Sequence, residues 1–207
     1  MLLAVKIKNG YLIARDTLIY ELDELDNSSV PSNDLLYPSY DNFDYVIGGE
    51  GEYRIIDFVK YLGGILPEKS TTLTTSELYN GFLPKVYDSL LKMHYIEESK
   101  AFNFDTKFMV ARKNKAFLID HGNVQEIGEE EVTGPGEEIA IASLLLTKGK
   151  PGLYRVMHAF DSTSKKSDRV GRNILVADTS KKEVKYTIYD SNDIEAILSG
   201  TFVPSSD

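Results

Sequence analysis

The sequence predicts an α+β fold in which helices cover packed sheets. Strand-forming stretches occur in clusters and helical stretches occur in pairs, so the chain does not alternate strand and helix as a doubly wound parallel sheet does. Hydrophobic residues make up 42% of the 207 residues, enough to bury a sizeable core in one domain. We therefore expect residues 1–207 to form a single domain, with an acidic loop at 21–42 and a loose C-terminal tail at 201–207.

The first twenty residues predict a hairpin. Asn9-Gly10 is a dipeptide that favours a tight turn, and it joins strand-like stretches at 2–8 and 11–20. Residues 43–49 then read as a short strand that runs into a glycine corner. Apolar spacing predicts helices near 53–62, 76–91, 136–149, 151–160 and 193–198, with Ser76 as an N-cap and Pro84 as a kink.

Further strands are predicted in the second half of the chain. They cover 104–111, 115–120, 124–127, 173–178 and 185–189, and residues 129–135 read as a loop.

Composition and charge exclude several functions. The net charge of −9 leaves no basic footprint for nucleic acid, and no run of about 18 apolar residues predicts a membrane span. Without cysteine the chain has no disulfide, thiolate metal site or cysteine nucleophile, which favours a cytoplasmic protein. The acidic segment lacks the spacing of a calcium loop, and Glu50 and Glu52 would repel a phosphate from the nearby glycines. We therefore predict no metal and no cofactor.

Several motifs resemble, in the same order, those of proteasome β-type subunits and the HslV-type peptidase. The resemblance runs from residue 2 to about residue 190 and rests on the opening hairpin through Asp16 and the Val46–Gly49 strand before a helix. It also rests on three later segments: the hairpin 108–124, the turn 132–136 before a helix, and the span 154–177. The resemblance implies an N-terminal nucleophile (Ntn) hydrolase fold, a four-layer αββα sandwich.

The resemblance also implies a catalytic site, of which this sequence retains only part. The family uses an N-terminal threonine as nucleophile, its own amine as base, and a lysine and two aspartates that support it. Asp16 matches the second-strand aspartate, and Asp168 matches the one near the fourth helix, with Asp161 as the alternative register. Met1 occupies the nucleophile position or follows it, and Gly171 replaces a supporting serine.

The supporting lysine is also missing, because no Lys or Arg lies between Asp16 and Tyr53. A lysine arriving from elsewhere, such as Lys85 or Lys107, would restore that part of the site. The sequence therefore favours a pseudoenzyme: a non-catalytic structural or assembly subunit of the cytoplasm, or of a virion if the chain is of viral or mobile-element origin. We expect it to associate with itself, as a ring or stack, or with a larger protein assembly. The alternative is an active Ntn-type amide hydrolase or peptidase with altered machinery.

Overall fold

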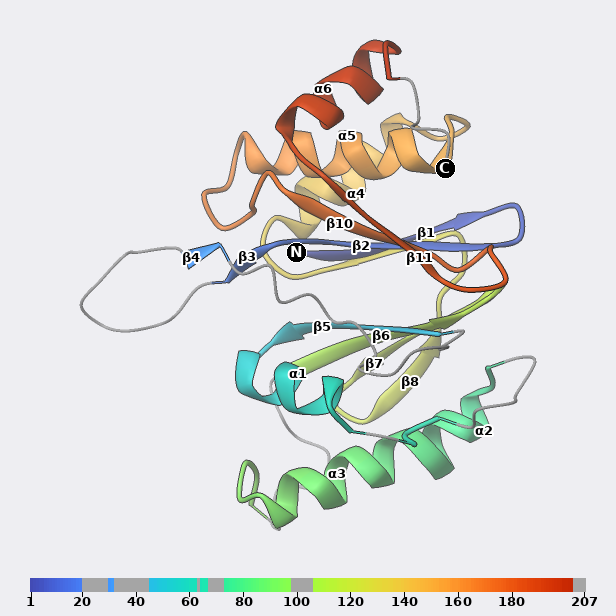
Figure 1. Cartoon of the computed structure of the whole chain (residues 1–207), viewed down its shortest axis with the longest axis vertical. Coiled ribbons are helices and arrows are strands. Elements are labelled where there is room, and N and C mark those ends of the chain that lie inside the picture. The colour runs from blue at the N-terminus through green and yellow to red at the C-terminus, as the bar shows by residue number, and fades with distance from the viewer. Residues whose placement is uncertain (20–29, 32–44, 63, 67–72, 98–105, 203–207) are drawn as a thin grey trace.

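The computed structural model consists of two β-sheets that pack face to face, each covered by helices on its outer side (Figure 1). It describes residues 1–19, 30–31, 45–62, 64–66, 73–97 and 106–202. Most of the predicted acidic loop 21–42, and residues 203–207 of the predicted tail, lie outside the described residues. The four layers agree with the predicted αββα sandwich.

The first sheet has five strands in the order β11-β10-β2-β1-β9. Its strands are β1 (Leu2–Ile7), β2 (Gly10–Asp16), β9 (Glu130–Thr133), β10 (Ile174–Asp178) and β11 (Lys185–Tyr189). β1 and β2 form the predicted hairpin around Asn9 and Gly10, and Leu3 pairs with Ala14. Every pair in this sheet is antiparallel, and the strand order places β2 at its centre with β1 beside it.

The second sheet has four strands in the order β5-β6-β7-β8. Its strands are β5 (Val46–Gly51), β6 (Thr106–Arg112), β7 (Lys115–Asp120) and β8 (Asn123–Glu126). At its β8 edge the hydroxyl of Tyr79 accepts a hydrogen bond from the backbone N–H of Val124 over 3.1 Å. A separate two-stranded ribbon pairs β3 (Leu18–Ile19) with β4 (Val30–Pro31).

Helices cover the outer faces of both sheets (Figure 1). α1 (Tyr53–Lys60) and α3 (Leu83–Lys92) lie on the four-stranded sheet, and α4 (Glu137–Leu146) and α5 (Gly152–Ser164) lie on the five-stranded sheet. α6 (Ser191–Ser199) packs beside α5. No helix among the described residues is both long and apolar enough to cross a membrane.

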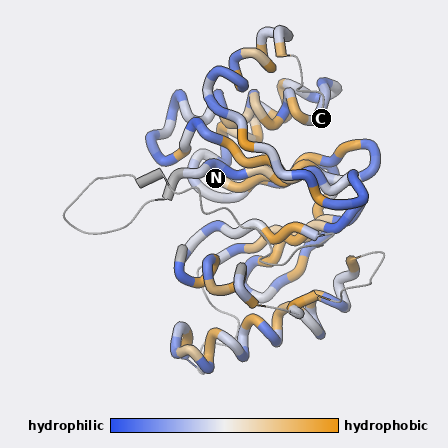
Figure 2. The backbone as a smooth tube through the Cα atoms, in the orientation of Figure 1, coloured by the Kyte–Doolittle hydropathy of each residue, from blue (hydrophilic) through white to orange (hydrophobic). Residues whose placement is uncertain are grey.

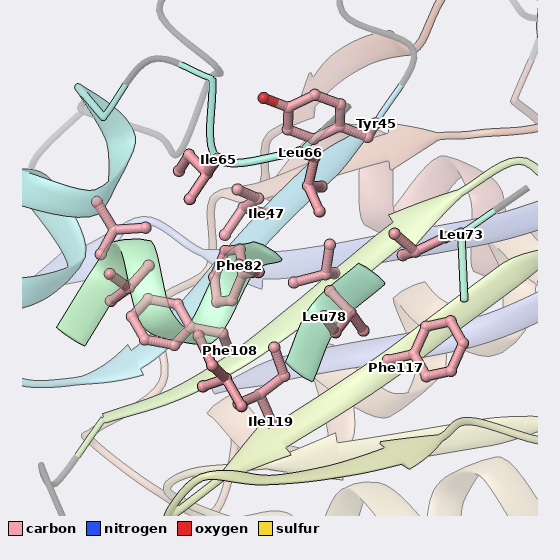
Figure 3. Close-up of a cluster of buried hydrophobic side chains, with 14 of the residues drawn as sticks. Tyr45, Ile47, Ile65, Leu66, Leu73, Leu78, Phe82, Phe108, Phe117 and Ile119 are labelled. Atoms are coloured by element: carbon pink, nitrogen blue, oxygen red, sulfur yellow. The ribbon is translucent and has the colours of Figure 1, made fainter. Parts of the chain in front are cut away.

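Three apolar clusters match the three interfaces between these layers. Alternation along β1 sends Leu3 and Val5 toward α4 and α5, and sends Leu2 and Ala4 toward the other sheet. Figure 3 shows the cluster under α1 and α3, where Phe82 packs against Phe108 with ring centroids 5.8 Å apart. Hydrophobic residues follow the strands of both sheets in Figure 2.

The hydroxyl of Tyr11, on β2, forms hydrogen bonds with the segment that connects the two sheets. Its hydroxyl lies 2.7 Å from the carbonyl oxygen of Ile127 and 2.8 Å from that of Gly128, in the connection between β8 and β9. Burial raises the pKa of Tyr11, which keeps this hydroxyl protonated and able to donate.

Two local predictions were wrong. The stretch 129–135 contains strand β9, which pairs with β1, because backbone pairing at a sheet edge tolerates the charged Glu130 and Glu131. The first cap of the 75–92 helical segment is Thr74 rather than Ser76, in a capping box with Glu77. Pro84 lies in the first turn of α3 after a π-helical turn, η1 (Leu78–Phe82), which follows α2 (Thr75–Glu77).

Candidate functional site

Asp16 lies at the end of β2, in the centre of the five-stranded sheet. Its register partner on β10 is Ile174, and on the other side its N–H donates to the carbonyl of Met1 over 3.4 Å. The N–H of the next residue, Thr17, donates to the carbonyl of Asn173 over 3.0 Å. Asp16 is therefore held from both neighbouring strands, and only 2% of its surface is exposed.

The α-amino group of Met1 faces the Asp16 carboxylate. Its nitrogen donates to Oδ2 over 2.7 Å, and both groups are buried. A buried carboxylate is stable when it is paired with an opposite charge and hydrogen-bonded, and this ammonium supplies both. Sequence reasoning named Asp16 but missed this partner, because the backbone amine belongs to no side-chain motif.

The side chains of the first two residues are also packed. Met1 belongs to the apolar cluster beneath α4 and α5, with Val170 and Ile174. Leu2 points to the other side of the strand and lies on β5, where a Cβ added to Gly48 would stand 2.7 Å from Leu2 Cδ1. A larger residue at position 48 would fit only if the Leu2 side chain moved.

A narrow crevice between the two sheets begins beside Leu2. Its described lining residues are Leu2, Ile13, Ala14, Arg15, Val46, Ile47, Gly48, Leu175, Ala177 and Tyr186. Among them only Arg15 and Tyr186 carry polar side chains, and none is Ser, Thr or Cys. The crevice therefore offers an apolar surface beside the N-terminus and none of the usual acyl-transfer nucleophiles among these residues.

Comparison with known proteins identifies the fold. No protein-family model and no curated protein matches the sequence. Among solved structures, the Anbu complex from Pseudomonas aeruginosa, described as a helical assembly, matches with a TM-score of 0.68 at 15% identity, over 96% of this chain and 91% of that chain. HslV from Trypanosoma brucei matches with a TM-score of 0.55 at 14% identity, over 91% of this chain and 98% of that chain.

BPH from Thiobacillus denitrificans, solved in complex with epoxomicin, matches with a TM-score of 0.61 at 14% identity, over 91% of this chain and 97% of that chain. This chain has a proteasome-like fold. The predicted resemblance to proteasome-type and HslV-type proteins is confirmed at the level of that fold.

In this proteasome-like chain, the two lysines that could have taken the place of the family's supporting lysine, Lys85 and Lys107, make other contacts. Lys85 donates to the carbonyl oxygen of Gly64. Lys107 pairs with Asp120 at 3.4 Å, at the far end of β7, where Asp120 also contacts His121 Nδ1 at 2.5 Å. Among the described residues, the ammonium of Met1 is a cation that pairs with Asp16.

The second predicted aspartate lies in a different environment. Asp168 is exposed, on the turn between α5 and β10, whereas Asp16 is buried. Asp161, the alternative, pairs with Lys165 one turn later in α5 at 2.7 Å. The roles of Asp16 and Asp168 as remnants of a catalytic site remain predictions.

One contact between nucleophile-type and base-type side chains lies outside this region. Ser143 on α4 is buried, and its Oγ lies 2.5 Å from Nδ1 of His158 on α5. His158 also stacks on Tyr154, with ring centroids 6.0 Å apart. Ser143 lies on α4 and His158 on α5, so their hydrogen bond joins these two helices. Among the described residues no group of three or more histidines and carboxylates is arranged to hold a metal ion.

Proposed function

We propose that this protein is a non-catalytic, assembly-forming member of the proteasome-like fold. The observation that carries the proposal is the buried pair between the Met1 ammonium and Asp16. An N-terminal nucleophile mechanism needs a hydroxyl or thiol on the first residue, with the neighbouring amine free to accept its proton. In this structure the residue beside Asp16 is Met1, whose side chain ends in a thioether and whose amine donates to the buried carboxylate.

The packing around the N-terminus supports the same proposal. On the inter-sheet side of the strand, Leu2 lies directly on the backbone of Gly48. The Met1 side chain lies on the other side of the strand, in the apolar cluster under α4 and α5. Close packing on both sides favours a structural role for the segment that carries the nucleophile in active relatives.

Epoxomicin tests whether the site is catalytic. BPH was solved in complex with this compound, so BPH is the positive control. The protein is incubated with epoxomicin and its intact mass is measured. We expect the mass of the chain beginning at Met1, with no adduct. An epoxomicin adduct, or a mature chain that begins at Thr or Ser, would reject the proposal in favour of the alternative, an active amide hydrolase.

Self-association is the second part of the proposal, and the helical assembly of Anbu supports it by analogy. Size-exclusion chromatography with light scattering at micromolar concentrations measures it directly. We expect a mass above that of one chain that falls on dilution. A monodisperse monomer throughout the concentration series would reject this part and leave the epoxomicin result to decide the catalytic question.

A further inference from the structure

Strand β11 is an edge of the five-stranded sheet. It is the last strand in the sheet order, and among the described strands only β10 pairs with it. Near its end, the side chain of Ile188 is 49% exposed. An edge strand that exposes apolar side chains and outward-pointing backbone groups is a place where another strand can add to the sheet. We therefore consider β11 as a contact surface.

The hydrogen bonds between β2 and β10 show which residues of β10 bond to β11. The N–H of Thr17 donates to the carbonyl of Asn173, and the N–H of Thr179 donates to the carbonyl of Tyr11. Successive residues of a strand direct their backbone groups to opposite sides. The odd-numbered residues of β10 therefore bond to β2, and its even-numbered residues bond to β11.

The same alternation identifies an outward-pointing residue on β11. Thr187 lies opposite Val176, and Tyr189 lies opposite Ile174, so both bond inward to β10. Ile188 lies between them, and its N–H and C=O consequently point away from β10, toward the open side of the sheet. One residue thus offers a backbone donor, a backbone acceptor and a half-exposed apolar side chain to an incoming strand.

Two other edge strands carry features that oppose such pairing. At β8 the hydroxyl of Tyr79 accepts the N–H of Val124. β9 carries Glu130, which pairs with Arg155, and charged side chains on an edge strand discourage the addition of another strand. Ile188, in contrast, is apolar, which favours contact at β11.

The segments before and after Ile188 carry opposite charges. Residues 181–185 include three lysines and one glutamate, and residues 190–195 include two aspartates, one glutamate and no lysine or arginine. Lys185 and Asp190 are both exposed. An antiparallel copy of the same strand would place each basic segment against an acidic one, whereas a parallel copy would place like charges together.

We propose that β11 binds β11 of a second copy, antiparallel across a twofold axis that passes between the two Ile188 residues. This inference rests on the self-association proposed above and names the strand that mediates it. The two Ile188 residues exchange two backbone hydrogen bonds, and their side chains lie side by side on one face of the joined sheet. The twofold axis repeats each contact between a basic and an acidic segment, so a copy of the chain satisfies both charged ends of β11.

Ile188→Cys tests the pairing, with Met93→Cys as the matched control. The chain contains no cysteine, so each variant has a single thiol. The Cα atoms of a hydrogen-bonded antiparallel pair lie about 5.5 Å apart, within the span of a disulfide. Met93 is 56% exposed at the end of α3, in the helix layer of the other sheet. We expect mild oxidation to produce a covalent dimer of Ile188→Cys much faster than of Met93→Cys on non-reducing gels.

Lys185→Cys measures the register. In the proposed register the two residues at position 185 lie roughly 20 Å apart along the joined strands, too far for a disulfide. We therefore expect this variant to cross-link no faster than Met93→Cys. Cross-linking of Lys185→Cys as fast as that of Ile188→Cys would reject the proposed register.

Ile188→Lys provides a measurement without a covalent bond. Two like charges would face each other at the axis, so we expect the dissociation constant from sedimentation equilibrium to rise by about tenfold or more. Met93→Lys should leave it unchanged, and circular dichroism checks that both variants fold. A wild-type chain that stays monomeric rejects self-association and this inference together. If the wild type associates, but Ile188→Cys cross-links no faster than its control and Ile188→Lys associates normally, the inference is rejected while self-association stands.

Discussion

Replacing Asp16 with alanine should destabilise the protein strongly. The substitution leaves the ammonium of Met1 buried without its carboxylate, at a position where both groups are shielded from water. Removing one partner of a buried ion pair typically costs about 3–5 kcal/mol. In a domain of this size each kcal/mol shifts the melting temperature by about 2–4 °C, so we expect a fall of roughly 6–20 °C.

Asp161→Ala is the control, because it also removes an aspartate carboxylate from an ion pair with an ammonium group. Asp161 pairs with Lys165 at 2.7 Å, the same separation as the buried pair, but on an exposed helix surface where Lys165 is 63% exposed. Such pairs contribute about 0.3–0.5 kcal/mol. Asp16→Asn keeps an oxygen acceptor for the ammonium and loses only the charge, so its effect should be intermediate.

The assay is urea denaturation followed by circular dichroism, with thermal melts as a second measurement. The three variants and the wild type are compared at pH 7, and the slope of the transition is checked to be unchanged. The reasoning about the buried pair is refuted if Asp16→Ala is no more destabilising than Asp161→Ala.

Three further predictions follow from the packing. Tyr11→Phe removes the hydroxyl that contacts the carbonyls of Ile127 and Gly128, and should lower the free energy of unfolding by about 1–2 kcal/mol in urea titrations; no loss would exclude those bonds. Gly136→Ala should destabilise more than Gly149→Ala in thermal melts, because both glycines have positive φ but only at Gly136 would the new Cβ meet Thr163, at 2.2 Å; equal losses would contradict this. Burial raises the pKa of the Glu131 carboxyl in the folded protein above its value in the unfolded chain. Between these two pKa values the folded protein retains a proton that the unfolded chain releases, so the free energy of unfolding falls as the pH rises. Glu131→Gln should therefore raise the melting temperature at pH 7 and not at pH 4, and a gain of equal size at both would refute the assignment.

Most of the fold could be predicted from local sequence signals. Asn9-Gly10 specifies a turn whose geometry fits a two-stranded hairpin, and alternation along Leu3 and Val5 identifies the buried face. Pro151 correctly predicts the start of a helix, α5, which begins at Gly152. Strand β9 could not be predicted, because its pairing with β1 joins residues far apart in sequence and its own residues show little apolar alternation.

The candidate site was predictable only in part. The family-like spacing in the hairpin identified Asp16, and the sequence shows no lysine or arginine between Asp16 and Tyr53. The Met1 ammonium that pairs with Asp16 could not be predicted, because this ion pair depends on the hairpin register that brings residue 1 beside residue 16. The exposure of Ile141, Leu145 and Leu146 on α4 could not be predicted either, since a helix with apolar residues on all sides is expected from its sequence to be buried.

The hydroxyl of Tyr79, which accepts the N–H of Val124, affects how copies of this protein can meet. An edge strand with unoccupied backbone groups can recruit a strand from another molecule and extend the sheet without limit. At β8 an incoming strand would first have to displace a tyrosine anchored in the π-helical turn η1. The Tyr79 hydroxyl thus already occupies a backbone donor that an incoming strand would need in order to pair with β8.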